Sequence, residues 1–212
     1  MFPNIKILNE LLTRVLCDEK PKIKAEAACI FAHSRDNEDT VLVKARFLYK
    51  SGLALTIAIC CVDEPQYFVK RWLNQISQLG APSKNVLLIE KTSDLPLSTD
   101  TETDFLTSFV AQNGWRNVYL VSTPFHQLRA FISVVSALSR IEKSFNKDIK
   151  FYNIVGSFDT RDKKVIHSQS QNAPRERREL FADELDKINK YFKKGILLRS
   201  EKIVEYLNTR AL

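Results

Sequence analysis

The stretch that decides the fold is VYLVSTPFHQLR, Val118–Arg129. Its first four residues, Val118–Val121, form a β-branched, aliphatic and aromatic run between Gly114 and Pro124, which is typical of a buried strand. Polar side chains then follow within two helical turns, among them the four candidates Ser122, Thr123, His126 and Arg129. A strand that delivers hydroxyls, an imidazole and a guanidinium to a helix start predicts a ligand site, because N–H groups at a helix N-terminus favour an anion.

Each of these polar residues also has a structural interpretation. Ser122 or Thr123 can cap the next helix, His126 can be a satisfied first-turn residue, and Arg129 can belong to a solvated face. Both interpretations stay open for any single residue, since clustered polar groups mark sites only on average. The four residues together favour a ligand site.

Strands alternate with helices on both sides of this stretch. The expected strands are Ala25–Ala32, Ala54–Val62, Asn85–Glu90, Val118–Val121 and Lys150–Val155. The expected helices between them are Thr40–Lys50, Pro65–Leu79, Thr101–Asn113 and Phe125–Arg140. This alternation predicts an α/β fold, a Rossmann-like, doubly wound and mainly parallel sheet of about five strands with helices on both faces. Ligands of such sheets bind beyond the carboxyl ends of the strands.

The chain of 212 residues fits a single domain. We expect an N-terminal helical arm in residues 1–20, where an apolar stripe starts near Ile5, and the Rossmann-like core in residues 25–156. Residues 157–173 are polar and predict a long mobile loop, either a lid or a disordered segment. Residues 174–212 are expected to form C-terminal helices, the first over Pro174–Lys194.

The positive charge gathers in the last third. The net charge is +7, and residues 140–212 contain 17 basic and 11 acidic residues, against 15 and 14 in residues 1–139. This permits an acidic partner. Nucleic acid is the weaker choice, because the Pro174–Lys194 helix interleaves acidic residues among its bases, which is typical of a solvated face with salt bridges. These acidic residues are Glu176, Glu179, Asp183, Glu184 and Asp186.

Cysteine usage indicates a reducing compartment. The four cysteines are Cys17, Cys29, Cys60 and Cys61, with no C-x-x-C pair and no histidine at zinc spacing. They predict no structural metal. No apolar run approaches the ~18 residues of a membrane span, and the start lacks the pattern of a signal peptide. We therefore expect a cytoplasmic protein without a transmembrane segment.

Several common catalytic motifs are missing from the sequence. The chain has five glycines and contains no Gly-x-Gly-x-x-Gly, Walker loop or Gly-x-Ser-x-Gly elbow. The remaining candidates lie at the expected strand ends. His126 suits acid or base chemistry at neutral pH, and Glu64 can orient a ligand hydroxyl or serve as the base. The alternative for Glu64 is a first-turn carboxylate that favours the helix dipole. The turn that contains His33, Ser34 and Asp36 adds further ligand groups.

The order and spacing of several motifs resemble a known family. The motifs are KARFLYKSG (Lys44–Gly52), the acidic Glu64, QLGAP (Gln78–Pro82), STDTETD (Ser98–Asp104) and YLVSTPFHQLRA (Tyr119–Ala130). Together they resemble the YdcF/SanA-like domain of unknown function over roughly Ala25–Arg140. The resemblance implies a Rossmann-like α/β domain, in agreement with the alternation above.

The resemblance also implies site residues. His33–Asp36 matches the family's first-strand turn, and Glu64 matches its acidic residue. Thr101 and Asp104 lie where the family has Thr and Asn. The strand-end segment supplies Ser122, Thr123, His126 and Arg129. Members are associated with envelope and polysaccharide precursor biology and with S-adenosylmethionine, which makes that molecule a candidate cofactor.

The chain departs from the family pattern in its glycines. Ala32 or His33 replaces the glycine of the first turn, and Cys60–Val62 replaces the glycines after the second strand, which removes room for backbone to approach a phosphate. Two hypotheses follow. In the first, the chain is an enzyme that acts on a phosphorylated or nucleotide-like small molecule, with His126 and Glu64 catalytic. In the second, it is a non-catalytic ligand-binding or regulatory module with a degenerate site.

Overall fold

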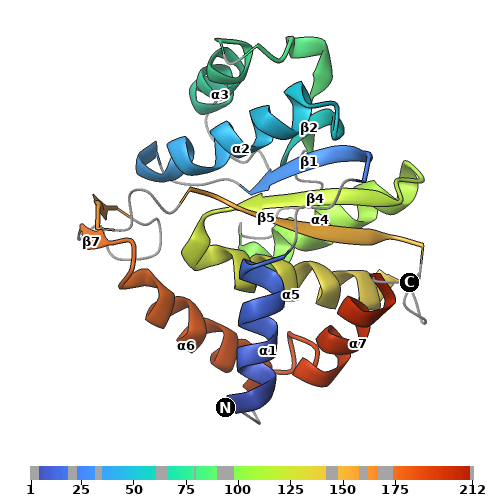
Figure 1. Ribbon diagram of the computed structural model, residues 1–212, viewed down its shortest axis with the longest axis vertical. Coiled ribbons are helices and arrows are strands. Elements are labelled where there is room, and N and C mark those ends of the chain that lie inside the picture. Colours follow the sequence, from blue (N-terminus) through green and yellow to red (C-terminus); the bar gives the residue numbers. More distant parts are fainter. Residues whose placement is uncertain are drawn as a thin grey trace.

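The computed structural model describes residues 5–18, 23–31, 35–60, 66–78, 80–89, 98–141, 148–157, 162–166 and 174–210. Its centre is one sheet with the strand order β3-β2-β1-β4-β5 (Figure 1). The strands are β1 (Ala25–Phe31), β2 (Ala54–Cys60), β3 (Val86–Ile89), β4 (Asn117–Ser122) and β5 (Lys150–Val155). Every neighbouring pair runs parallel. The expected Rossmann-like, doubly wound α/β fold is therefore confirmed.

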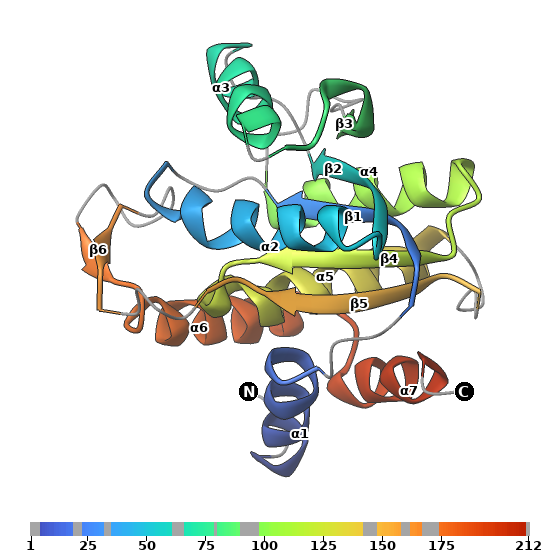
Figure 2. The same cartoon turned by 45° about the horizontal axis from the view of Figure 1, so that its top comes forward.

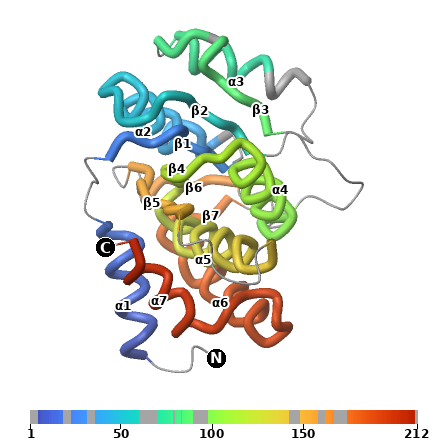
Figure 3. The backbone as a smooth tube through the Cα atoms, turned by 90° about the vertical axis from the view of Figure 1, so that its right-hand side faces the viewer, coloured from blue at the N-terminus to red at the C-terminus, as the bar shows by residue number. Residues whose placement is uncertain are grey.

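Helices cover both faces of the sheet. One face carries α2 (Glu38–Lys50) and α3 (Gln66–Gln78), and the other carries α4 (Thr99–Gln112) and α5 (Pro124–Ile141) (Figure 2). Three more helices pack against α5 on its outer side, as Figure 3 shows, namely α1 (Ile5–Leu16), α6 (Leu180–Lys193) and α7 (Ser200–Arg210). These three correspond to the expected N-terminal helix and C-terminal helical extension.

Helix α5 is the most deeply buried element outside the sheet. Of its 18 residues, 15 are buried, because the sheet lies on one side and the helices α1, α4, α6 and α7 lie on the others. Polar side chains on α5 therefore face protein in every direction and need protein partners. None of the described helices combines the length and the apolar character that crossing a bilayer requires.

The expected helix over Pro174–Lys194 is wrong at its start. Helix α6 begins only at Leu180, and Arg175–Glu176 (β7) instead pairs antiparallel with Lys164–Val165 (β6). The pairing places one strand of a short ribbon, β6, within the expected loop 157–173 and the other, β7, just after it. Two-residue strands carry no periodic signal, so the sequence could not show them. The helix starts where the apolar stripe of α6 begins, at Leu180.

Gly156 lets the end of β5 pass close to two neighbouring segments. Its N–H donates to the Ser122 carbonyl at 2.8 Å, and the next N–H, that of Ser157, donates to the Thr40 carbonyl at 3.2 Å. A Cβ at position 156 would lie 3.0 Å from the Ser122 oxygen and 3.1 Å from the Thr40 oxygen. The chain thus leaves β5 across the end of β4 towards α2, at the carboxyl edge of the sheet.

The buried layer around α5 makes a prediction about stability. Phe131 is fully buried and its ring lies 6.0 Å from that of Tyr206 on α7. Phe131→Ala should lower the free energy of unfolding by about 3–5 kcal/mol, because it leaves a cavity. The matched control is Phe47→Ala on α2, where the side chain is 54% exposed; it should cost less than about 1 kcal/mol. Urea unfolding measures both, and equal losses would contradict the packing described here.

Candidate functional site

The strand order places a topological switch point between β1 and β4. Strand order runs outward from β1 to β3 in one direction and from β4 to β5 in the other. Crevices at such points, outside the carboxyl ends of the strands, are where doubly wound sheets bind ligands. Here β1 ends at Phe31, β4 ends at Ser122, and α5 begins at Pro124. The residues around these ends therefore define the candidate site.

His126 lies in the first turn of α5 at this switch point. Its side chain is almost wholly buried, and its ring packs edge-on against Phe31 at 6.1 Å between ring centres. The ring nitrogen Nδ1 lies 2.9 Å from Oε2 of Glu184 on α6. One carboxylate from the last third of the chain thus meets the imidazole at the end of β4.

Arg129 lies one helical turn after His126 and is 1% exposed. Its Nη1 donates to the Thr99 hydroxyl at 2.6 Å, and its Nη2 donates to Glu184 Oε1 at 3.2 Å. Its Nε donates to Glu184 Oε2. All three nitrogens of the guanidinium therefore face protein groups. That Arg129 contacts a ligand anion directly stays a prediction.

Glu184 is the residue that the sequence interpretation missed. It is 2% exposed, and besides His126 and Arg129 it accepts from Lys187 Nζ at 2.8 Å. Its assignment to a solvated face is wrong, because the carboxylate lies under α5. A signal existed in the sequence: Glu184 stands four residues from both Leu180 and Ile188, in the middle of the buried stripe of α6.

The buried cluster shifts the pKa values of its members. Burial, followed by the charge of Arg129, lowers the pKa of His126 below its ordinary value, although Glu184 opposes the shift. Burial by itself raises the pKa of Glu184, but the contacts with His126 and Arg129 outweigh it and hold this pKa well below the ordinary range. At neutral pH the cluster therefore contains a neutral imidazole and an ionised carboxylate.

Ser122 and Thr123 are both fully buried at the end of β4. The Thr123 carbonyl accepts from the backbone N–H groups of His126 and Gln127 at 3.0 and 2.9 Å. The Thr123 hydroxyl, by contrast, has no hydrogen-bond partner in the described part of the chain. Buried hydroxyls are normally paired, so an unpaired one at a helix N-terminus calls for an explanation.

Thr101 and Asp104 lie on α4 without reaching His126. Thr101 forms a capping box with Ser98, where the Ser98 N–H donates to the Thr101 hydroxyl at 2.8 Å. Asp104 is half exposed and pairs with Arg140 at 2.7 Å. The α4 residue that enters the cluster is Thr99 instead, through Arg129.

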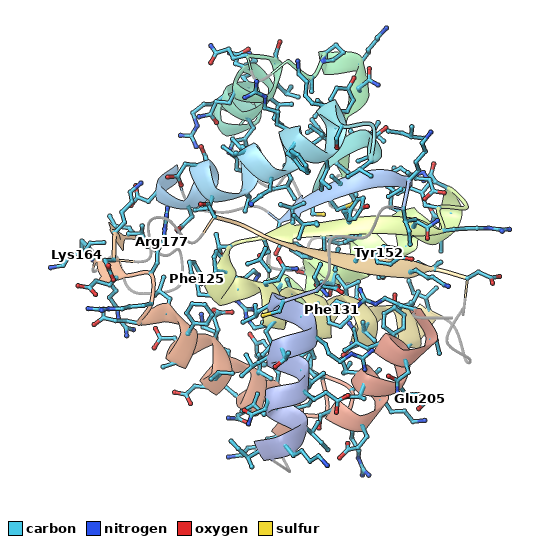
Figure 4. All side chains as sticks on the ribbon, viewed as in Figure 1. Phe125, Phe131, Tyr152, Lys164, Arg177 and Glu205 are labelled. Atoms are coloured by element: carbon cyan, nitrogen blue, oxygen red, sulfur yellow. The ribbon has the colours of Figure 1, made fainter. Side chains whose placement is uncertain are left out.

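Asp36 follows β1 and forms a hydrogen bond with the chain next to β6 of the β6–β7 ribbon. Its carboxylate accepts from the Ile166 N–H at 2.9 Å. Arg177, almost wholly buried just after β7, donates to Asn37 Oδ1 at 3.0 Å and to Asp39 Oδ1 at 2.9 Å. Figure 4 shows Arg177 and Phe125 on the same side of the molecule. The ribbon and α6 therefore both attach at the carboxyl edge of the sheet.

Three predicted site residues, His33, Ser34 and Glu64, lie outside the described residues. Where the chain is described, no group of three His, Cys, Asp or Glu side chains is arranged to hold a metal ion. The site that the structure brings together thus consists of His126, Arg129, Thr123, Thr99 and Glu184.

A second buried carboxylate, which the sequence also did not reveal, lies on the other face of the sheet. Glu38 is 5% exposed at the start of α2 and accepts from Trp72 Nε1 at 2.6 Å and from Arg71. Both partners come from α3. We assign Glu38 the structural role of holding α3 against α2.

The chain was compared with protein-family models, with curated proteins and with solved structures, and none of these comparisons found a match. The resemblance to the YdcF/SanA-like family therefore stays a proposal.

The lowered pKa of His126 predicts how stability depends on pH. A group that is harder to protonate in the folded state favours unfolding once the unfolded chain takes up the proton. The contribution of His126 to the free energy of unfolding is complete above pH 6.5, the ordinary pKa of histidine. It is lost as the pH falls from there towards the pKa that His126 has in the folded protein. Urea unfolding between about pH 5 and pH 8 should show a steeper loss for the wild type than for His126→Gln.

The other two histidines of the chain are present in both proteins, so the difference between the two curves isolates His126. Parallel curves would show that the imidazole titrates alike in the folded and unfolded states.

Proposed function

We propose that this protein binds a small anionic molecule, phosphorylated or nucleotide-like, at the carboxyl ends of β1 and β4. The observation that carries the proposal is the buried His126 at the topological switch point, next to the Thr123 hydroxyl, which has no hydrogen-bond partner among the described residues. Both groups lie at the N-terminus of an 18-residue helix, which favours negative charge. His126 and Thr123 are the side chains that contact the ligand.

The charge of the cluster also suits an anion. Arg129 and Lys187 each bring a positive charge, and Glu184 brings one negative charge. With a neutral His126 the cluster keeps a surplus of one positive charge, in a buried setting where charges are weakly screened. An anionic ligand balances this surplus, whereas a cationic one adds to it.

An enzyme is the form of this proposal that the geometry supports best. A histidine oriented by a buried carboxylate is an arrangement that general acid or base catalysis uses. A second candidate is a non-catalytic binding or regulatory module that uses the same site. It is favoured by the guanidinium of Arg129, whose nitrogens already face Glu184 and Thr99. Turnover of the bound ligand separates the two. S-adenosylmethionine, whose sulfonium and ammonium groups outnumber its one carboxylate, suits this charge balance less well than a phosphorylated ligand in both.

Thr123→Val tests the site because it removes the hydroxyl and keeps the shape of the side chain. Since this hydroxyl is buried and has no partner where the chain is described, its loss should change the free energy of unfolding by less than about 1 kcal/mol. A ligand that uses it should bind about tenfold more weakly. Thermal shifts measure both effects, with nucleotides, nucleotide sugars, sugar phosphates and S-adenosylmethionine as probes.

Thr13→Val is the matched control, because Thr13 is exposed on α1, away from the switch point. It should leave every shift unchanged. If no probe raised the melting temperature of the wild type, the proposed ligand class would be wrong. Equal shifts in the wild type and Thr123→Val would place the ligand elsewhere.

A further inference from the structure

We infer that Glu184 is a positioning residue that keeps the imidazole hydrogen of His126 on Nδ1, so that Nε2 is the proton acceptor and His126 works as a base. This inference rests on the proposed function, in which His126 contacts the ligand. It also gives the last third of the chain a role in the site, because Glu184 comes from α6. Among the described residues, Glu184 is the carboxylate that touches the imidazole.

The donors around Glu184 fix the direction of the hydrogen bond. The carboxylate receives Nε and Nη2 of Arg129 and Nζ of Lys187, all of which can only donate. Two cations beside it keep Glu184 ionised, and an ionised carboxylate can only accept. Nδ1 of His126, 2.9 Å away, must therefore carry the hydrogen.

The surroundings of the ring decide its charge. Among the described residues, Glu184 and Lys187 from α6, Arg129 from α5 and the apolar ring of Phe31 from β1 face it. Burial and the charge of Arg129 lower the pKa of His126, so the ring is neutral at neutral pH. A neutral ring with its hydrogen on Nδ1 has a lone pair on Nε2.

In the resting protein this arrangement makes His126 a general base and not a general acid. A neutral imidazole can remove a proton but has none to give from Nε2. On a phosphate ester, the oxygen of a water molecule bonds to phosphorus as its proton passes to Nε2. The bond from phosphorus to the leaving oxygen breaks, and that oxygen takes the proton from the imidazolium. Glu184 stabilises the imidazolium while it exists, as the carboxylate does in hydrolase triads.

Arg129 and Thr99 act through Glu184. The guanidinium binds both carboxylate oxygens, and the Thr99 hydroxyl accepts from its third nitrogen at 2.6 Å. Such paired hydrogen bonds restrict the orientation of a carboxylate. Glu184 thereby orients the imidazole, a different role from that of Glu64, which the sequence suggested as a group that orients a ligand hydroxyl or as the base.

Nitrogen NMR of the ring tests this inference without any ligand. The chain has three histidines, and the His126→Gln variant identifies the signals of His126. In the wild type we expect one neutral tautomer with the hydrogen on Nδ1 at about pH 7. In Glu184→Gln the amide can donate as well as accept, and the ring should lose its single tautomer and show signals with the hydrogen on Nε2.

Asp183→Asn is the matched control, because Asp183 precedes Glu184 on α6 and pairs with Arg175 at the surface. It should leave the His126 tautomer unchanged. A wild-type ring with its hydrogen on Nε2, or an imidazolium at neutral pH, would overturn the inference. The wild-type spectrum therefore tests the inference even if Glu184→Gln does not fold. The NMR experiment uses no ligand. A failed prediction of the tautomer can therefore be told apart from a failure of ligand binding, which the Thr123→Val experiment measures.

Discussion

The contact between Arg129 and Glu184 joins the last third of the chain to the sheet. Both side chains are nearly inaccessible to water, and removing each charge from water costs several kcal/mol. The structure compensates for this cost with a guanidinium that reaches both carboxylate oxygens, and with Lys187 and Thr99 at the two ends. If α6 left its place, Arg129 would lose the counter-charge of Glu184. The position of α6 therefore depends on this pair.

The same pair connects packing with chemistry. Helix α5 needs protein partners for its polar residues because it is buried on all sides, and the carboxylate that satisfies Arg129 also holds His126. The imidazole is thus fixed by a helix from the far end of the sequence, at the point where the strand order reverses. The β6–β7 ribbon reaches the same edge through Arg177 and Asp36. What looks in the sequence like an appendage is part of the candidate site.

The sheet could be predicted from the sequence because its signals are local. Apolar runs such as Val118–Val121 and turn residues such as Gly114 and Pro124 mark strands and helix starts without reference to distant residues. The polar cluster at the start of α5 could be found in the same way. The pairing of Arg129 with Glu184 could not, because the two residues are separated by 55 positions and no local pattern joins them. The ribbon was hidden for a similar reason, since its contacts join residues that are far apart in the sequence.

The contacts of Arg129 show which part of the site the sequence predicts and which part it does not. The sequence predicts a ligand anion near its guanidinium, and in the structure this guanidinium holds a carboxylate of the protein in the fork geometry that suits such groups. The sequence did not reveal that this carboxylate belongs to the chain itself. Only the apolar neighbours of Glu184 on α6, four residues away on each side, indicate that its side chain points inward.

The most direct test of this account is a double-mutant cycle on the pair, with Arg129→Met, Glu184→Met and the double variant unfolded in urea. Each single substitution leaves one buried charge without its partner and should cost about 3–5 kcal/mol. The double variant removes both charges, so its loss of stability should be smaller than the sum of the two single losses, with an interaction energy of about 2–3 kcal/mol. Losses that add to within about 0.5 kcal/mol would show that Arg129 and Glu184 do not depend on each other, and would contradict the central claim.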